Sequence, residues 1–457
     1  MTATGKVARG VAWTVGTYAA SIVTRFGSNI ILSRLLTPET FGMVMIVNTV
    51  RQGVDLSADV GLAQNVIQNK VGGSPEFFNT AWIMQIVRGV FLCVVLLICA
   101  APIGQLYSVP ESAFALSGAI LLVAGLASTS LLLLHRRLQL AKLTMFDLAQ
   151  DVVGAAIVIM AALVSPTINS LMIGVLIAAL IRTATSYFLT DDRNRIAFNK
   201  TYAWEILTFG RWIFLSSILM FLCMSFDRLY IGHVAPLAVV GVYAIARTLA
   251  DMPILLASRI GYSVVFPVVS EAQGHARADT RARLSAIRFK LLVVAAASVA
   301  FGISVADLAV HLAYDARYHE AGWMLPILLF GVWLAILCSI NEYAILGFGK
   351  PSYAVVANGT KLAYYLIALP LAYRYLGILG AIMVVALSDL GRYAVIGVGQ
   401  KREQFSFLTQ DAVATLLFLS MVLAMSGIRS LAGFGSAFDT VPLNEIAGLL
   451  GTLDGGN

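Results

Sequence analysis

Ten ionisable side chains lie near the middle of long apolar runs of the sequence, where an unpaired charge would be costly. They are Arg25, Arg51, Asp55, Arg88, Arg182, Arg247, Asp251, Lys361, Asp389 and Arg392. Each would cost about 2.5–3.5 kcal/mol on insertion scales if it faced lipid, so together they must face protein or water. Seven are basic and three are acidic. The surplus of positive charge predicts a cationic cavity for an anionic polar group, with all seven basic residues as candidate ligands.

Three couples among these residues have helical spacing. Arg51 and Asp55 are four residues apart, as are Arg247 and Asp251, and Arg392 lies three residues after Asp389. Residues at this spacing share one face of a helix. Two interpretations stay open: the couples neutralise each other and fasten helices, or the carboxylates take part in coupling to an ion such as H⁺ or Na⁺.

The remaining cations have no partner nearby in the sequence. Arg25, Arg88, Arg182 and Lys361 lack a carboxylate at helical spacing. The planar fork of arginine binds phosphate through two parallel hydrogen bonds, so these side chains suit a phosphorylated substrate. The alternative is that each pairs with a carboxylate far away in the sequence. Asp227 and Arg228 lie closer to the end of their run and are expected to snorkel.

The composition excludes a soluble enzyme and a nucleic-acid binder. Of 457 residues, 59% are hydrophobic and 12% are charged, and the mean hydropathy is +0.85, whereas soluble domains carry about 25% charged residues. No zinc-protease, serine-hydrolase or nucleotide-binding motif is present, and the five histidines have no ligand spacing. We therefore expect no enzyme activity, metal or cofactor. The four cysteines all lie in apolar runs and are expected to be buried and unpaired.

The sequence predicts thirteen membrane-spanning helices, because a helix needs about 20 apolar residues to cross the hydrocarbon layer. The expected spans are 11–35, 41–62, 79–103, 113–134, 147–165, 168–190, 208–233, 238–267, 287–310, 323–347, 353–375, 378–398 and 410–428. The fold class is thus an all-α polytopic membrane protein.

Lysine and arginine in the loops predict a cytoplasmic N-terminus. With that orientation, seventeen basic residues lie on the inside and four on or near the outside. The basic run from Arg277 to Arg288 is interpreted as an anchor near anionic lipid. The tail after Arg429 is expected outside.

The layout also suggests an internal repeat. Gly10 and Trp13 open the first span and Gly210 and Trp212 open the seventh, and each pair is followed by a proline turn at Pro38 or Pro236. Two six-helix lobes entering from the same side are parallel repeats, which is a transporter architecture. We expect an N-lobe over 1–190, a cytoplasmic linker over 191–207, a C-lobe over 208–398, and an inner loop, a thirteenth span and an outer tail over 399–457.

Four short motifs resemble a known family. They are Leu32–Gly42, the pair Asp227–Gly232 with Val240–Ala244, Leu134–Leu138 and Gly347–Pro351. In this arrangement they resemble the polysaccharide transporter (Wzx-type flippase) branch of the multidrug/oligosaccharidyl-lipid/polysaccharide exporter superfamily, over about residues 5–400. The resemblance implies a bacterial inner-membrane flippase that moves undecaprenyl-pyrophosphate-linked oligosaccharide outward for exopolysaccharide, capsule or O-antigen synthesis. It also implies possible work beside a polysaccharide polymerase and a chain-length regulator.

Two other functions are weighed against the flippase. A multidrug or cation antiporter of the same superfamily should present acidic charge to its substrates, and here basic charge prevails. A membrane glycan polymerase should carry a long outer loop with catalytic residues, and the expected outer loops have about ten residues or fewer. The flippase is the function that the sequence favours.

Overall fold

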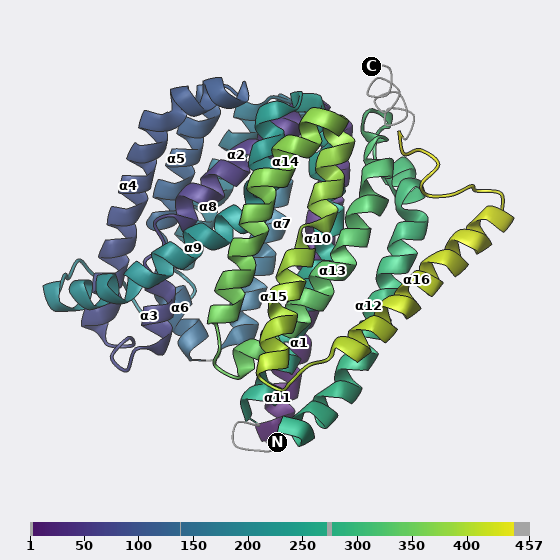
Figure 1. Ribbon diagram of the computed structural model, residues 1–457. Coiled ribbons are helices and arrows are strands. Elements are labelled where there is room, and N and C mark those ends of the chain that lie inside the picture. The colour runs from purple at the N-terminus through teal and green to yellow at the C-terminus, as the bar shows by residue number, and fades with distance from the viewer. Residues whose placement is uncertain (1–2, 138, 272–276, 443–457) are drawn as a thin grey trace. The chain divides into compact units, whose positions relative to one another are not determined.

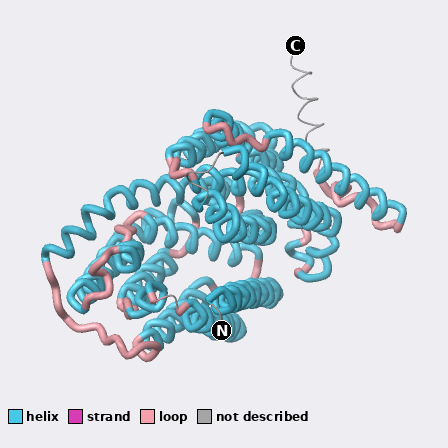
Figure 2. Tube along the Cα trace, turned by 90° about the horizontal axis from the view of Figure 1, so that it is seen from below, coloured by secondary structure: helices cyan, strands magenta, loops and turns pink. Residues whose placement is uncertain are grey.

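The computed structural model describes residues 3–137, 139–271 and 277–442, and these residues form helices joined by short loops, with no strand among them (Figure 2). The chain divides into two compact units, Met1–Phe221 and Leu222–Asn457. This division falls inside one helix, α9 (Lys200–Val234). The lobes and the linker expected from the sequence stay predictions.

Unit 1 contains eight helices and the first part of α9. They are α1 (Ala3–Leu35), α2 (Pro38–Leu56), α3 (Leu62–Gln68), α4 (Pro75–Tyr107), α5 (Glu111–Gly125), α6 (Ser130–Arg136), α7 (Leu140–Val164) and α8 (Ile168–Ser186). The proline turn of the sequence is the start of α2: Thr37 accepts a hydrogen bond from the Thr40 amide at 3.4 Å, and Pro38 stands at the first helical position. This combination ends one helix and starts the next.

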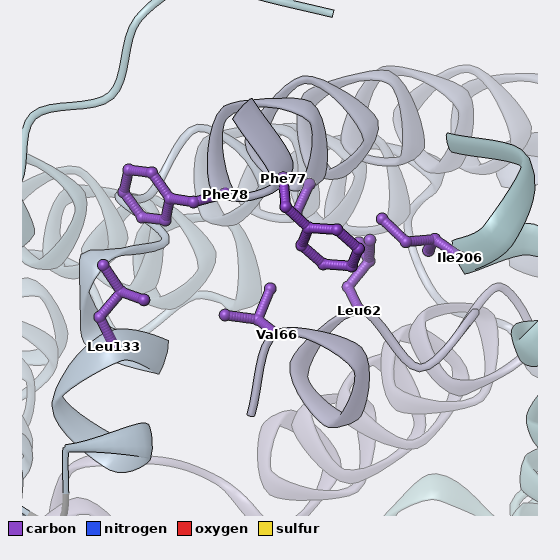
Figure 3. Packing of buried hydrophobic residues seen from close by; sticks show 7 residues of the cluster. Leu62, Val66, Phe77, Phe78, Leu133 and Ile206 are labelled. Carbon is purple, nitrogen blue, oxygen red and sulfur yellow. The ribbon is translucent and has the colours of Figure 1, made fainter. Parts of the chain in front are cut away.

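A small hydrophobic core joins four elements of unit 1. Phe77 and Phe78 from the start of α4 pack with residues of α3, α6 and α9 (Figure 3). The labelled partners are Leu62, Val66, Leu133 and Ile206. Burial of these side chains fixes the short helices α3 and α6 against the ends of the long ones.

Unit 2 contains the rest of α9 and the helices that follow. They are α10 (Leu237–Ile260), the π-helical turn η1 (Gly261–Val265), α11 (Phe266–Glu271), α12 (Arg277–Ala313), the 3-10 turn η2 (Ala316–Tyr318), α13 (Ala321–Gly347), α14 (Ser352–Leu387), α15 (Asp389–Arg402) and α16 (Leu408–Leu431).

Helix α14 folds back on itself at Gly377. This residue has φ 56° and ψ −145°, a conformation that is open in practice to glycine alone. The second leg returns beside the first and continues as α15 (Figure 1), so that Lys361 Nζ lies 2.9 Å from Asp389 Oδ2. The expected eleventh and twelfth spans, which meet near residue 376, correspond to these two legs.

Helices α12 and α16 run in the same direction (Figure 1). Arg288 of α12 pairs with Asp411 of α16, and Asp307 of α12 pairs with Arg429 of α16 at 2.5 Å. The two contacts are 19 residues apart on α12 and 18 on α16, which corresponds to roughly 27 Å along each helix. Two helices can pair in this way only when they are parallel.

Each of the thirteen expected spans overlaps one or more helices, but the count of thirteen is not confirmed. Of the described helices, nine are long and apolar enough to cross a membrane, or ten if the bent pair α5 and α6 is one span. One of the nine, Ser352–Arg402, is the stretch that folds back at Gly377.

Two expected spans end early. The span over 41–62 is helical only as far as Leu56, because Gly61 adopts a left-handed conformation with φ 64° and Asp59 accepts its amide hydrogen bond at 2.9 Å. The span over 113–134 is broken between α5 and α6, which meet at 59°. Gln85 donates to the carbonyl oxygens of Gly125 and Ala127 at 3.0 Å there, which replaces helix bonds lost at the break.

Candidate functional site

In unit 1, two arginines from different helices approach the same side of α7. Arg25 of α1 lies 3.4 Å from Asp151, and the Ser21 hydroxyl donates to the same carboxylate. Arg182 of α8 lies 2.6 Å from Asp147. Arg25 is 72% exposed, and Arg182 and Asp147 are 44% and 45% exposed. Helices α7 and α8 are apolar enough to span a membrane, and yet these charges remain accessible.

A third arginine of unit 1 pairs between α4 and α2. Arg88 donates to the Asp55 carboxylate at 2.6 Å and to the Ala58 carbonyl oxygen at 2.8 Å. The expected couple of Arg51 with Asp55 is therefore replaced by the pair of Arg88 with Asp55. Arg51 donates instead to the Asn48 amide oxygen at 3.2 Å, and among the described residues its Nε has no hydrogen-bond partner.

In unit 2, a compact charge cluster joins α9 and α10. Arg247 and Asp251 form the expected couple at 3.4 Å, and Arg247 also lies 3.4 Å from Asp227. Asp227 is fully buried and accepts a hydrogen bond from Tyr243 at 2.5 Å, while Arg228 pairs with Asp251. Asp227 does not snorkel as expected, because its carboxylate is fully buried and paired inside the unit, whereas Arg228 keeps 24% of its side chain exposed while it pairs with Asp251.

A second network of unit 2 joins α13, α14 and α15. Asp389 pairs with Lys361 at 2.9 Å and with Arg392 at 2.7 Å, which confirms the third expected couple. Arg392 also binds Glu342 at 2.7 Å. The side chains of Asp389, Lys361 and Arg392 are buried. Two positive and two negative charges make this network neutral.

The four cations that lack local partners are thus all paired over long sequence distances. Sequence reasoning missed the carboxylates Asp147, Asp151 and Glu342. They could have been found as acids near the ends of apolar runs, but nothing in the sequence shows which arginine each one meets. With them and the α9–α10 pairs counted, the intramembrane set holds eight basic and seven acidic groups. The expected surplus of four positive charges falls to one.

Arg288 also differs from its expected place. It was interpreted as part of a lipid-facing anchor, but it is buried at 1% exposure against Asp411 at 2%. It also donates to Asn341 at 2.8 Å and to Gln410 at 2.6 Å. The guanidinium thus joins its own helix α12 to α13 and α16.

Outside the expected spans, Arg137 and Asp192 form an exposed ion pair. Arg137 binds Asp192 through two hydrogen bonds of 2.6 and 3.0 Å, and this carboxylate raises the pKa of the guanidinium. The segment beyond Asp192 is tied to unit 1, since the Arg195 amide donates to Asn79 at 2.9 Å and the Asn199 amide to Thr80 at 3.1 Å. These hydrogen bonds hold residues 195 and 199 against the start of α4.

The described residues contain no group of three or more histidine, cysteine, aspartate or glutamate side chains that could hold a metal ion. The four cysteines are free; Cys223 and Cys338 are buried, and Cys93 and Cys99 are half-buried.

Long helices with neutralised charges in their interior define an all-α polytopic membrane protein. The family model described as "Polysaccharide biosynthesis protein" matches residues 31–322. The chain belongs to this family. This agrees with the resemblance seen in the sequence motifs.

Curated relatives are similar over part of their length. The chain is 24% identical over 340 residues to the succinoglycan biosynthesis transport protein ExoT of Rhizobium meliloti (strain 1021), covering 73% of this chain and 67% of that one. It is 23% identical over 269 residues to the lipopolysaccharide biosynthesis protein WzxC of Escherichia coli (strain K12), covering 58% and 53%.

Solved structures share the fold. The lipid II flippase MurJ in an inward closed conformation matches with a TM-score of 0.68 at 11% identity, covering 92% of this chain and 100% of that one. An inward-facing multidrug resistance MATE family transporter of the MOP superfamily matches with a TM-score of 0.61 at 14% identity, covering 87% and 95%. The chain thus has the fold of flippases and transporters of this superfamily.

Proposed function

We propose that the chain is a flippase of the bacterial inner membrane that moves a lipid-linked oligosaccharide diphosphate from the inner to the outer leaflet. The expected substrate is undecaprenyl-pyrophosphate-linked oligosaccharide for exopolysaccharide, capsule or O-antigen synthesis. The transport mode is alternating access through a cationic cavity, without catalysis and without a cofactor.

The observation that carries this proposal is the accessibility of the arginines of unit 1. Arg182 stays 44% exposed on α8, a helix apolar enough to span a membrane, and Arg25 stays 72% exposed on α1, which covers the first expected span. Lipid offers a guanidinium no hydrogen-bond partner, so an exposed arginine in a span faces water or a polar ligand. Arg51 adds a cation that, among the described residues, hydrogen-bonds to the Asn48 amide oxygen and not to a carboxylate. A diphosphate is the ligand that such forks bind best.

The other predicted ligands have a different role in this proposal. Arg247, Lys361 and Arg392 are bound in neutral clusters of unit 2. They stabilise the helices on which the substrate path depends. Asp251 and Asp389 are their counter-ions. Coupling to H⁺ or Na⁺ through these carboxylates is a second proposal, after their structural role.

The direct test is a flipping assay in proteoliposomes with a fluorescent polyprenyl-diphosphate sugar and a membrane-impermeant quencher. The wild type should expose the labelled lipid on the far leaflet, and an Arg25→Ala/Arg182→Ala variant should not. The same vesicles loaded with a fluorescent organic cation test the antiporter alternative. Export of the cation but not of the lipid would overturn the flippase.

Orientation has its own test. A reporter fused after Arg195 should be active only in the cytoplasm, and one fused after Val109 only outside. The reverse pattern would place the N-terminus outside. Co-purification from cells would test whether a polysaccharide polymerase or a chain-length regulator is a partner.

A further inference from the structure

The two carboxylates that hold the exposed arginines lie on one face of α7. Asp147 and Asp151 are four residues apart, so their side chains project from the same side of the helix. The exposed apolar side chains Met145, Val152 and Met160 lie on the opposite side. Helix α7 therefore has one face suited to lipid and one polar face that carries two acids a single turn apart.

The polar face of α7 is shared by its two neighbours. Helices α1 and α8 both pack against α7, and each supplies one arginine, Arg25 to Asp151 and Arg182 to Asp147. Gln150, which lies between the two acids in the sequence of α7, donates a hydrogen bond to Thr185 of α8 at 3.1 Å. Arg182 also lies over the Phe146 ring at 5.3 Å.

Both pairs are open to exchange. The contact of Arg25 with Asp151 is long, at 3.4 Å, and the two pairs are exposed at 24–72%. Exposed pairs of this kind contribute little to stability, so a ligand can take over either arginine at small cost. The buried pair of Arg288 with Asp411 has no comparable access.

A diphosphate that takes both arginines leaves the two acids without their counter-ions. The stranded carboxylates are then one turn apart, beside the negative charge of the ligand, on a helix whose other side is apolar. Two like charges at this distance disfavour each other, and the negative charge of the ligand adds to the repulsion. Protons from the solvent relieve this repulsion.

We propose that Asp147 and Asp151 are a proton-exchange pair: when the diphosphate binds Arg25 and Arg182, the released carboxylates take up protons, and they return them when the ligand leaves. This inference rests on the proposed function, because it needs an anionic ligand at the two arginines. Both acids are then positioning residues that couple ligand binding to proton uptake. No separate ion-binding site is needed for this coupling.

The surrounding charges favour this assignment. Besides the two arginines, the described titratable or charged side chains on α7 and on the helices that pack against it are Arg34 on α1, His135 and Arg136 on α6, and Lys142 on α7. None is a carboxylate. The guanidinium of Arg136 is bound to the carbonyl oxygens of residues 66–70, so it is not available as a replacement counter-ion.

The test measures proton uptake upon ligand binding with the full chain in lipid nanodiscs. The probe is a short polyprenyl diphosphate that carries one sugar; both phosphates are esterified and stay ionised, so the probe itself does not titrate. Calorimetry in two buffers of different ionisation enthalpy counts the protons. We expect uptake of about one to two protons per bound probe, and an affinity that weakens about tenfold per pH unit for each proton as the pH rises.

Variants separate this inference from its alternatives. Asp147→Asn/Asp151→Asn should bind the probe at least as tightly as the wild type, without proton uptake. Asp192→Asn is the matched control, since Asp192 also pairs with an arginine at 2.6 Å but lies outside the spans; it should keep the wild-type uptake. Wild-type binding with no proton uptake and no pH dependence between pH 6 and 8 would overturn the exchange alone. Absence of binding would overturn the proposed function itself.

Discussion

The ion pairs on α7 in unit 1 and those on α16 in unit 2 have the same chemistry and opposite surroundings. On α7, Arg182 and Asp147 meet at 2.6 Å with nearly half of each side chain exposed. On α16, Asp411 and its partner Arg288 are buried almost completely, at 2% and 1% exposure. The two pairs differ in how far solvent can reach them.

This difference assigns different work to the two sets. A buried ion pair cannot exchange partners without stranding a charge, which is strongly destabilising. An exposed pair loses little when it opens, so it can give way to a ligand. We therefore expect substitutions in the exposed set to change transport, and substitutions in the buried set to change folding.

The largest effect on stability is expected from Asp411→Ala. It leaves Arg288 buried without its counter-ion, with only the amide oxygens of Asn341 and Gln410 as partners. Breaking a buried pair costs about 3–5 kcal/mol. Thermal unfolding in detergent, followed with a thiol-reactive dye that reports exposure of Cys223 and Cys338, should show a much lower midpoint.

The matched control is Asp147→Ala, the same substitution in an exposed pair, which should cost less than about 1 kcal/mol. A second control replaces both partners, as Arg288→Met/Asp411→Leu, and should recover most of the lost stability because no buried charge remains. Equal losses from Asp411→Ala and Asp147→Ala would break the comparison.

A smaller loss of stability is expected at Gly377, the turn that brings Lys361 of α14 beside Asp389 of α15. Gly377→Ala places a Cβ atom on a backbone with φ 56° and ψ −145°, although nothing lies within 4 Å of that atom. The cost is therefore backbone strain alone, about 1–3 kcal/mol. Gly359→Ala is the control, since it lies in the same helix with no unusual φ and also has open space; it should be neutral or slightly stabilising. Unfolding midpoints that fall equally for both variants would argue against the fold-back.

At Arg25 the effect on stability should be small and the effect on transport large. Arg25→Ala removes only an exposed contact of 3.4 Å, worth less than about 1 kcal/mol, so the protein should accumulate normally in the membrane. Glycan export should nevertheless be lost, and Arg25→Lys should also impair it, because lysine cannot form the two parallel bonds to phosphate. Arg137→Lys, at a bidentate pair outside the spans, should leave export intact. Full export by the Arg25→Ala variant would remove Arg25 from the site.

Much of the fold could be predicted from the sequence, because apolar runs and helix-start signals act locally. The Thr37–Pro38 start of α2 and the two legs of α14 on either side of residue 376 are examples. The expected couples of Arg247 with Asp251 and of Asp389 with Arg392 follow from helical spacing in the same way.

The candidate site was less predictable, because its pairs join helices far apart in the sequence. Asp151 lies 126 residues from Arg25, and Asp411 lies 123 residues from Arg288. The spacing of Arg51 and Asp55 predicted a local couple, but Arg88 competes successfully for the carboxylate by also binding the Ala58 carbonyl oxygen. Whether a charge is buried depends on which helices meet, and this is a property of the packed bundle.

The smallest effect is expected at Asp315, in the loop between α12 and α13. Its carboxylate accepts hydrogen bonds from the Arg317 Nε at 2.7 Å and the Arg317 amide at 3.1 Å, and these bonds hold the pKa of the carboxyl below its usual value. A carboxyl whose pKa is lower in the folded state stabilises the protein above the unfolded pKa of about 3.9, and this contribution is lost as the pH falls through the folded pKa. Asp315→Asn should therefore lower the unfolding midpoint slightly at pH 7, and the difference from the wild type should shrink as the pH falls below about 3.9 and through the lowered folded pKa. Since this pair is exposed, the shift should stay far below that of Asp411→Ala at every pH. A shift as large as the one at Asp411 would mean that access to solvent does not set the strength of these ion pairs, and the distinction between the exposed pairs of α7 and the buried pairs of α16 would fail with it.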